Sequence, residues 1–448
     1  MPSRNEIENI VSLIKFGNLN EKFFPPELIK IIVDHYYSYC FKNKNQLLEA
    51  INGYPENIKK YGNISNWDVS KVTDMSNLFY CRNCKKYDNI YEWDTSNVID
   101  MNSMFYGSDF ICNISKWDVS KVINMSRMFF SCNFYNEISK FDISEWNVKN
   151  VSNMSYMFSG SNFKDDISKW NVFNVNSMNN MFSGSEFNNN ISNWNVASVN
   201  DMSYMFHYSD FNSDISNWNV SKVYNMKSMF ENSIFNCDLS KWDVSNVYDM
   251  SWLFSDSEIN NDKSKRNVNI SNWKVSNVTN MSFMFKGSFF NSDISNWDVS
   301  KVINMTCMFE KSLFNKDISK WDVSNVIYMT KMFDNSNFNS CISNWNVYNV
   351  NDMCQMFYYS KFNCDISNWN VSNVYDMRRL FAGSVFNGDI SNWNVSNVDT
   401  MYAMFSNSIF NKNISNWNVS KNTNIESIFY KSSFNGELLK WKVKPTGF

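Results

Sequence analysis

Tryptophan recurs along this chain at a fixed interval, and that regularity constrains the fold more than any other feature. Between Trp146 and Trp242, and again between Trp273 and Trp441, successive tryptophans are 24 residues apart. With three more at the front, sixteen copies of a repeat are marked by Trp67, Trp93, Trp117, Trp146, Trp170, Trp194, Trp218, Trp242, Trp273, Trp297, Trp321, Trp345, Trp369, Trp393, Trp417 and Trp441. Only Trp252 falls outside the register. A period of roughly 20 to 50 residues predicts a repeat architecture in which each copy packs on its neighbours.

Each copy, called a coil below, follows the pattern I-S-x-W-(D/N)-V-S-x-V-x-x-M-S-x-M-F, as in residues 294–309. Its first half has the apolar skeleton of a leucine-rich repeat, with Trp and Val in place of Leu. W-x-V therefore predicts a short strand, and the strands of successive coils are expected to form a parallel sheet along one side. Val302, Met305, Met308 and Phe309 have the spacing of one or two helical turns behind that sheet.

A residue that tolerates the left-handed conformation follows two positions after the core Phe in many coils. These residues are Gly160, Gly184, Gly287, Gly383, Asn232, Asn335 and Asn407. The expected fold class is a repeat solenoid, a leucine-rich-repeat-like α/β stack of about sixteen coils of 24 residues with a one-sided parallel sheet of short strands. One coil cannot bury enough apolar surface to offset its own ordering, so coils are stable only when stacked.

The methionine and tryptophan ladders have two interpretations, a cofactor or metal stripe and simple core packing. Leu78, Leu253, Leu380, Ile425 and Ile428 replace Met in the same ladder, and none of them is a metal ligand. Core packing is therefore the interpretation that we adopt.

Bulk properties bound the function. The formal net charge of -3 offers no basic field for nucleic acid, so no nucleic-acid partner is expected. The first residues are polar and acidic instead of forming an apolar secretory signal, and no stretch has the roughly 18 apolar residues of a membrane span. Ten cysteines at irregular places do not form a small disulfide framework. We expect mostly reduced thiols and an intracellular, cytoplasmic location, with surface exposure as the alternative.

The sequence contains few residues that are candidates for catalysis or metal binding. Cys81 and Cys84 form the one cysteine pair at metal or redox spacing, without a second pair or a nearby histidine. His35 and His207 are the only histidines and lie far apart in sequence. We therefore expect no enzyme, no cofactor and no metal site.

Three polar ladders are expected to face solvent beside the strand, and they are the first candidates for contact with a partner. The residue after Trp is Asp or Asn, as in Asp68, Asp118, Asn195, Asn219, Asp298 and Asp322. Phe173, Ala197 and Tyr348 replace the usual Ser two positions further on, and exposed aromatic residues are reasonable anchors for a protein. Drift on a tolerant surface explains these replacements equally well.

Three coils are longer than 24 residues, and insertions in repeat proteins are loops that often mark a binding face. The insertion around residues 263–269 holds a basic cluster, Lys263, Lys265 and Arg266. A solvated loop is the alternative interpretation of this cluster.

Residues 1–60 lack the repeat, whereas residues 61–448 contain it. Helical spacing occurs around residues 7–14, after Pro25 and Pro26, and at Leu47, Leu48 and Ile51. The first 60 residues therefore predict a small helical cap that covers the first coil.

The coil pattern resembles the BspA-like leucine-rich-repeat family, in particular its tryptophan- and methionine-rich branch of mycoplasma surface lipoproteins. The resemblance covers roughly residues 45 to 444 and includes the entry segment K-Y-G-N-I-S-N-W-D-V-S at residues 60–70. It implies a surface protein or adhesin that binds host proteins or glycans. From the polar and acidic first residues we expect no signal peptide, and in this respect the chain departs from that family.

Residues 24–32, F-P-P-E-L-I-K-I-I, are similar to the opening of an F-box, which docks a substrate receptor on a ubiquitin ligase. That resemblance implies a ligase adaptor as partner, docking on Pro25, Pro26, Leu28, Ile29 and Ile32. An F-box-like head before a repeat array in a sequence of this composition is typical of a large DNA virus or a protist, acting in the cytoplasm of an infected host cell. Two functions stay open: an intracellular protein-binding scaffold that acts as a ligase substrate receptor, and a surface adhesin.

Overall fold

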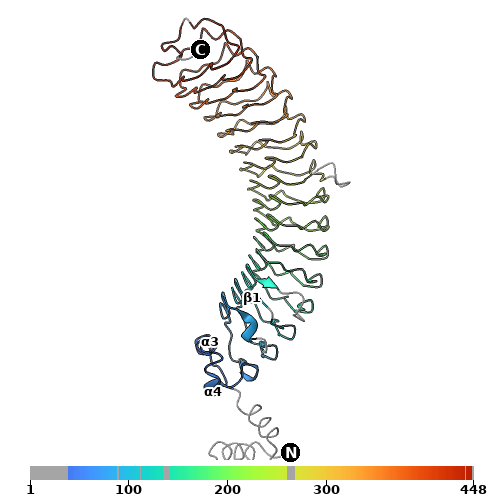
Figure 1. Cartoon of the computed structure of the whole chain (residues 1–448). Helices are drawn as coiled ribbons and strands as arrows, with labels where there is room; N and C mark the ends of the chain where they lie inside the picture. The colour runs from blue at the N-terminus through green and yellow to red at the C-terminus, as the bar shows by residue number, and fades with distance from the viewer. Residues whose placement is uncertain are drawn as a thin grey trace, which may run out of the picture. The chain divides into compact units, whose positions relative to one another are not determined.

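The computed structural model describes residues 39–87, 90–110, 112–134, 142–259, 268–438 and 440–445. The chain divides into two compact units, Met1–Asn174 and Val175–Phe448, and each is considered by itself. Figure 1 shows that successive coils lie one on another within each unit. No helix among the described residues is both long and apolar enough to cross a membrane.

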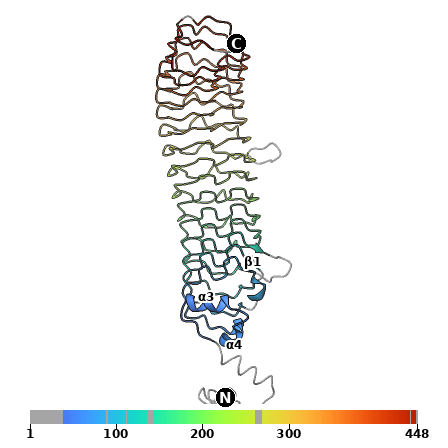
Figure 2. The same ribbon diagram turned by 60° about the vertical axis from the view of Figure 1, so that its left-hand side comes forward.

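Among the described residues, two helices precede the first coil. Helix α3, Lys44–Asn52, lies where the spacing of Leu47, Leu48 and Ile51 predicts a helix, and the Asn43 side chain caps it by accepting from the Gln46 N–H at 3.1 Å. Helix α4 follows at Ile58–Tyr61. Figure 2 shows both helices beside the first coils. The expected helices at residues 7–14 and after Pro25 lie outside the described residues.

The segment before α3 pairs with the first coil. Cys40 forms a parallel bridge with Asp68, the Phe41 N–H donates to the Asp68 carbonyl at 2.9 Å, and the Asp68 N–H donates to the Tyr39 carbonyl at 3.1 Å. Leu47 and Ile51 of α3 are buried, and the Tyr87 hydroxyl donates to the Ile51 carbonyl at 3.3 Å. These contacts satisfy main-chain groups at the open end of the first coil.

Regular secondary structure inside the coils is short. The remaining named elements are the 3-10 helices η1, Ile64–Asn66, and η2, Cys84–Tyr87, and the two-residue strands β1, Asp109–Phe110, and β2, Asn133–Phe134, which pair in parallel. In the described parts of the chain, W-x-V contains no assigned strand and M-S-x-M-F no assigned helix. The hydrogen bonds of the coils explain both differences from the sequence-based expectation.

Coils are joined along M-S-x-M-F. The N–H groups of Met281, Phe283, Phe285 and Gly287 donate to carbonyls of the next coil at 2.7 to 3.0 Å. The N–H groups between them donate within their own coil, as Met284 does to the Met281 carbonyl at 3.3 Å. One set of N–H groups thus donates to the neighbouring coil, and the N–H groups between them donate within tight turns of their own coil. Neither a helix nor a strand has this alternation of hydrogen bonds. A parallel bridge at the residue before the first Met repeats from coil to coil, as in Asn280↔Asn304 and Asn304↔Tyr328.

Backbone conformation explains why this segment is not a helix. Two residues of this segment, four positions apart, have a positive φ, for example Phe283 at 61° and Gly287 at 63°. Such residues end a right-handed helix. The prediction of left-handed residues after the core Phe is confirmed for Gly160, Gly184, Gly287, Gly383, Asn232, Asn335 and Asn407. Apart from Asp68 of the first coil, no described W-x-V forms a bridge with another segment, and the N–H of Trp297, for example, bonds to the Ile294 carbonyl of its own coil at 3.1 Å.

One apolar ladder fills the interior of the coils. Met305, Met308 and Phe309 are fully buried, and Trp297 is 3% exposed. Trp297 and Trp321 stack with ring centroids 6.5 Å apart and planes 1° from parallel. The interpretation of the methionine and tryptophan ladders as core packing is confirmed.

An asparagine ladder ties the returning turns together. The Asn315 side-chain oxygen accepts from the Asn339 main-chain N–H at 2.8 Å, and Asn339 accepts in the same way from Asn363 at 2.8 Å. The abundance of Asn in this sequence therefore has a structural reason, since its short amide reaches the backbone of the next coil.

Candidate functional site

The residues that vary most around M-S-x-M-F form one surface, which we call the turn face. It consists, in each coil, of the residue before the second core Met and the two residues after the core Phe. In the coil of Leu380 and Phe381, where Leu380 replaces the second Met, these are Arg379, Ala382 and Gly383. Because the Met and Phe side chains point into the core, the residues between and after them face away from it.

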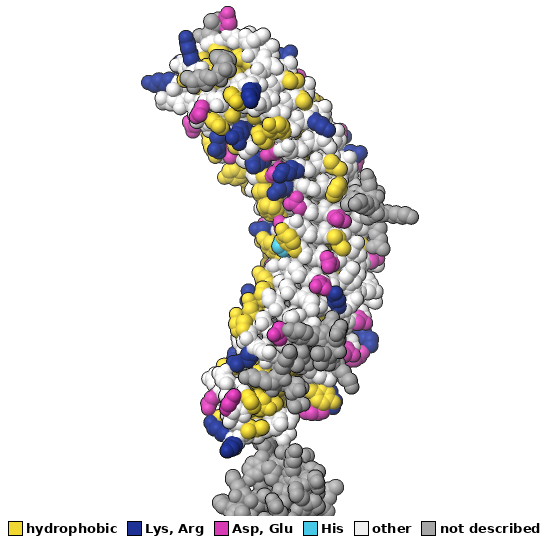
Figure 3. Space-filling model, in the orientation of Figure 1, with side chains coloured by type: hydrophobic (Ala, Val, Ile, Leu, Met, Phe, Trp, Pro, Cys, Tyr) yellow, Lys and Arg dark blue, Asp and Glu magenta, His cyan; other side chains and the backbone are white. Residues whose placement is uncertain are grey.

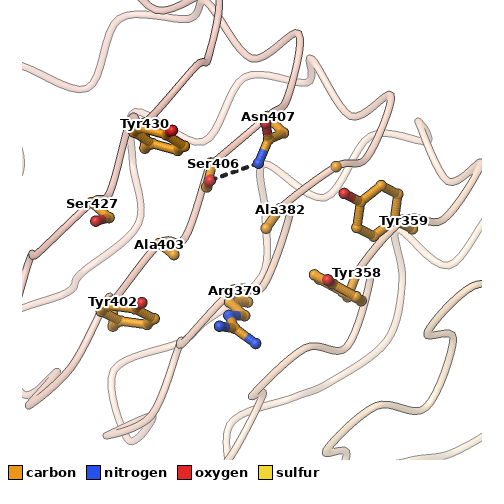
Figure 4. A pocket seen from close by; sticks show the side chains of 11 residues that line it. Tyr358, Tyr359, Arg379, Ala382, Tyr402, Ala403, Ser406, Asn407, Ser427 and Tyr430 are labelled. Carbon is orange, nitrogen blue, oxygen red and sulfur yellow. Dashed lines mark hydrogen bonds between the residues drawn. The ribbon is translucent and has the colours of Figure 1, made fainter. Parts of the chain in front are cut away.

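A hollow of about 320 Å³ lies on the turn face of the second unit. Its wall is made by Tyr358, Tyr359, Tyr402 and Tyr430, and Arg379 lies between Tyr402 and Tyr358 (Figure 4). The remaining residues that line it are small or uncharged: Ala382, Gly383, Ala403, Ser406, Asn407 and Ser427. The volume is that of a small ligand pocket or of a cavity for a few side chains.

Side-chain size creates the hollow. Tyr358 and Tyr359 follow the core Phe in one coil, whereas Ala382 and Gly383 occupy the same places in the next. A Cβ built on Gly383, which has a φ of 67°, would lie 2.6 Å from the Tyr359 ring. Glycine at this position therefore leaves room for the Tyr359 ring and keeps the hollow open.

Two adjacent arginines beside the hollow have different electrostatic settings. Arg378 pairs with Asp376, its NH2 nitrogen 2.6 Å from Oδ2, and this carboxylate raises the pKa of Arg378. The Arg379 guanidinium is exposed and its carbon lies 5.5 Å from the centre of the Tyr402 ring. Among the described residues no carboxylate forms a salt bridge with Arg379, and no acidic residue lines the hollow. The hollow thus offers a positive charge without a counter-ion.

Aromatic residues occur on the turn face of other coils as well. In the first unit Tyr80 stacks on Tyr106 and Tyr106 on Phe130, with ring centroids 4.6 Å apart in both pairs. In the second unit Trp252 stacks on Phe283 at 3.8 Å. Figure 3 shows hydrophobic side chains gathered in patches along one side of the coils, with Lys and Arg among them. Exposed aromatic residues next to cations are typical of protein-binding surfaces.

A protein-family model described as "Mycoplasma protein of unknown function, DUF285" matches residues 45–161, 135–233, 207–269, 257–363 and 358–446. The chain belongs to the DUF285 family. The five overlapping matches also establish that it is a repeat protein. A search of curated proteins found no significant match.

The polar residues after Trp have a local role in this DUF285 chain. The Asp298 carboxylate accepts from the Ser300 N–H at 3.1 Å and from the Ser300 hydroxyl at 2.6 Å. The Asn219 amide oxygen accepts from the Ser221 N–H at 3.1 Å in the same way. The pKa of Asp298 is lowered, first by the Ser300 hydroxyl and then by its N–H. Each residue closes a turn to the backbone two positions on, which either Asp or Asn can do.

The other members of that ladder make the same bond. Accepting oxygens and donating N–H groups pair as Asp68 with Ser70, Asp118 with Ser120, Asn195 with Ala197, and Asp322 with Ser324. These residues do not line the hollow on the turn face.

Phe173 and Tyr348 are half-exposed, at 50% and 49%, and neither lines the hollow. The Tyr348 carbonyl accepts from the Asn373 amide at 2.8 Å, so its backbone belongs to a ladder between coils. The basic cluster of Lys263, Lys265 and Arg266 lies outside the described residues. The F-box-like residues Pro25, Pro26, Leu28, Ile29 and Ile32 lie outside them too.

Titratable groups elsewhere on the coils differ in their exposure. The Nε2 atom of His207 lies 3.6 Å from Glu231 Oε2, and burial lowers the pKa of His207 and raises that of Glu231. Cys81 is exposed and Cys84 is buried, its thiol donating to the Arg82 carbonyl at 3.8 Å. In the described ranges no group of three or more His, Cys, Asp or Glu is arranged to hold a metal ion.

The candidates expected from the sequence lie along W-x-V, in the insertion around residues 263–269 and in residues 24–32, and none of those that the structure describes lies on the turn face. One signal for that face was present: Trp252, the single Trp outside the 24-residue register, occupies the same coil position as Phe283, Arg379 and Ala403. A bulky aromatic residue at a non-core position of a repeat is an indication of exposure.

Proposed function

We propose that this DUF285 chain is a non-enzymatic binding scaffold that presents its turn face to a protein partner. The observation that carries the proposal is the hollow lined by Tyr358, Tyr359, Tyr402 and Tyr430 beside an unpaired Arg379. Tyr and Arg are the residues that most often dominate protein-binding energy, because they combine a large apolar area with directional polar groups.

The same proposal includes the architecture. We regard the chain as a repeat solenoid of the leucine-rich-repeat-like, BspA-like type, which the W-x-V skeleton and the pairing of successive coils support. Main-chain bonds such as that from the Phe285 N–H to the Met308 carbonyl, at 3.0 Å, hold neighbouring turns in register. A surface that is ordered before binding loses little entropy when a partner docks.

The partner setting that we favour is intracellular, with residues 1–60 docking a ligase adaptor and the coils receiving the substrate. The F-box-like similarity at residues 24–32 motivates this part of the proposal. A pulldown with the full chain, repeated without residues 1–60, tests it. Loss of an adaptor together with retention of other partners is the expected result, and an unchanged set of partners contradicts it.

A surface adhesin is the second candidate function. The resemblance of the coil pattern to mycoplasma surface lipoproteins motivates it. Stacked rings such as the exposed Tyr80 and the partly buried Tyr106 and Phe130 would suit host proteins or glycans. Surface labelling of native cells distinguishes the two settings: labelled chain supports the adhesin, and protected chain supports the intracellular scaffold.

The turn face is tested by comparing two double variants. Tyr359→Ala with Tyr430→Ala removes two exposed rings of the hollow, whereas Phe173→Ala with Tyr348→Ala removes two exposed rings outside it. We expect quantitative affinity capture to lose partners with the first pair and keep them with the second. The reverse pattern would indicate that the partner binds at W-x-V. Equal capture by both variants would indicate that none of these four rings takes part in binding.

A further inference from the structure

The hollow has a charge pattern that specifies its occupant more narrowly than a protein partner in general. Arg379 is its one charged lining residue, and the rest of the lining is tyrosine or small neutral side chains. Lys431, next to Tyr430, adds a second cation near the rim, with Nζ 5.2 Å from the centre of the Tyr430 ring. A site with cations and no lining acid attracts an anionic group.

The guanidinium group of Arg379 has a geometry that suits a carboxylate. The guanidinium carbon of Arg379 lies 5.5 Å from the centre of the Tyr402 ring. A guanidinium held in this way presents a planar fork, which matches both oxygens of a carboxylate. Because Arg378 already binds Asp376, Arg379 is the guanidinium of this pair that an outside carboxylate can reach.

The rings around Arg379 indicate what accompanies that carboxylate. Tyr359 and Tyr430 are half-exposed, at 50% and 46%, and they line the hollow together with Arg379. Tyrosine side chains provide rigid apolar area for neighbouring side chains and hydroxyls for main-chain groups. An extended peptide, whose side chains alternate along about 3.3 Å per residue, supplies both kinds of partner on either side of a carboxylate.

We propose that the Tyr358–Tyr430 hollow binds an acidic segment of a protein, with an Asp or Glu carboxylate on Arg379 and its neighbours against the tyrosines. This rests on the proposed binding function and names the chemistry of its partner. The carboxylate replaces water on the Arg379 guanidinium, and the flanking side chains cover the rings of Tyr359 and Tyr430.

The test uses the full chain and a displayed library of random twelve-residue peptides. We expect enrichment of Asp and Glu among peptides selected by the unaltered chain, and no such enrichment with Arg379→Gln. Arg127→Gln is the matched control, since Arg127 occupies the same coil position, has a φ of 55° beside the 53° of Arg379, and has its guanidinium carbon 4.8 Å from the Tyr156 ring. Selection by Arg127→Gln is expected to match that of the unaltered chain.

Affinity measurements on one selected peptide complete the test. Replacing its acidic residue with the corresponding amide, or Arg379 with Gln, is expected to weaken binding about 10- to 100-fold. The affinity of Arg379→Lys, which keeps the charge and loses the planar fork, is expected to lie between that of the unaltered chain and that of Arg379→Gln. Hydrogen exchange of residues 366–438 that is unchanged in each variant shows that the coils remain folded.

The possible outcomes distinguish a failure of the acidic-segment proposal from a failure of the protein-binding function. Selected peptides without acidic enrichment, or acidic peptides that bind Arg379→Gln as well as the unaltered chain, overturn the acidic-segment proposal and leave a protein-binding function standing. Binding of an acidic polysaccharide such as polyglucuronate that depends on Arg379, with no peptide selected, overturns it in favour of a glycan. A chain that captures neither peptides nor cellular proteins overturns both proposals.

Discussion

The indole Nε1 of Trp321 donates a hydrogen bond to the main-chain carbonyl of Ile294 in the preceding coil at 3.1 Å. The same carbonyl accepts the Trp297 N–H within its own coil, also at 3.1 Å. The Trp ladder therefore does two things at once: it fills the core, and it uses the one polar atom of its ring to join neighbouring coils. A buried Trp needs such a partner for its N–H.

Trp321→Phe is expected to destabilise the coils around it by about 1 to 3 kcal/mol, because it removes the bond to Ile294 and leaves a smaller ring in a packed interior. Hydrogen exchange should quicken in residues 294–345 before it does in distant coils, since each coil depends on its neighbours. Trp252→Phe is the control, since Trp252 lies on the turn face and is only partly buried. Equal effects of the two substitutions would falsify the role assigned to the Trp321 indole.

A second prediction concerns the turn after Trp and whether the charge of its Asp contributes to stability. Asp298→Asn is expected to leave stability at neutral pH nearly unchanged, because Asn195 and Asn219 make the same bond with an amide oxygen. Asp298→Ala removes the acceptor for the Ser300 N–H and is expected to cost about 1 kcal/mol. Urea denaturation followed by local hydrogen exchange checks both values.

Acid provides a second measurement on the same residue. Since the folded pKa of Asp298 is lowered, its stabilising effect is present above its unfolded pKa and disappears as the pH falls through the folded one. The Asn variant has no such carboxyl group, so its stability should decline less than that of the unaltered chain in this acidic range. An Asn variant that loses as much stability as the Ala variant at neutral pH contradicts the local role of this ladder.

Core positions and left-handed residues could be predicted from the sequence because they repeat. Met305, Met308 and Phe309 are buried as their pattern requires. The local conformation could not be predicted, because residues three apart lie on one side of a helix and also of consecutive tight turns. What decides between them is the set of main-chain bonds to the next coil, such as Phe283 to Thr306 at 2.8 Å, and no single coil contains that information.

The candidate site was harder to predict for a related reason. A repeat pattern draws attention to the positions that recur, whereas the hollow exists because neighbouring coils differ: Tyr359 beside Gly383, and Arg379 beside Ala403. Its shape depends on which coil lies next to which. That order is present in the sequence, but it becomes a surface only once the turns are known to align.

Glycine at the left-handed position makes a third prediction. A Cβ on Gly287 would lie 2.1 Å from Asp256 Oδ1, and the φ of 63° is itself unfavourable for alanine. Gly287→Ala is therefore expected to cost more than the roughly 1 to 2 kcal/mol of the backbone alone. In an Asp256→Gly background the clash is absent, and the penalty should shrink to that backbone cost. Thermal unfolding of the four chains measures the difference, and an unchanged penalty in the Gly background contradicts the clash.

The fourth prediction concerns Asp334, whose pKa is shifted in the opposite direction to that of Asp298. It is only 4% exposed, and burial, with Glu310 nearby, raises its pKa to about 6. Because the folded state holds this proton more tightly than the unfolded state, the contribution of Asp334 is most favourable below its unfolded pKa and is lost as the pH rises through about 6. Asp334→Asn, neutral at every pH, is expected to be more stable than the unaltered chain at pH above about 7, by about 1 to 2 kcal/mol.

The pH dependence distinguishes this effect from simple repacking. The advantage of Asp334→Asn should diminish between about pH 6 and 4, where the unaltered Asp334 takes up its proton in the folded state. Urea midpoints at several pH values measure it, with Asp298→Asn as the control, since the lowered pKa of Asp298 gives a difference only in stronger acid. An advantage of the same size at every pH would mean that packing around Asn335 and Glu310, and not the buried charge, separates the two chains.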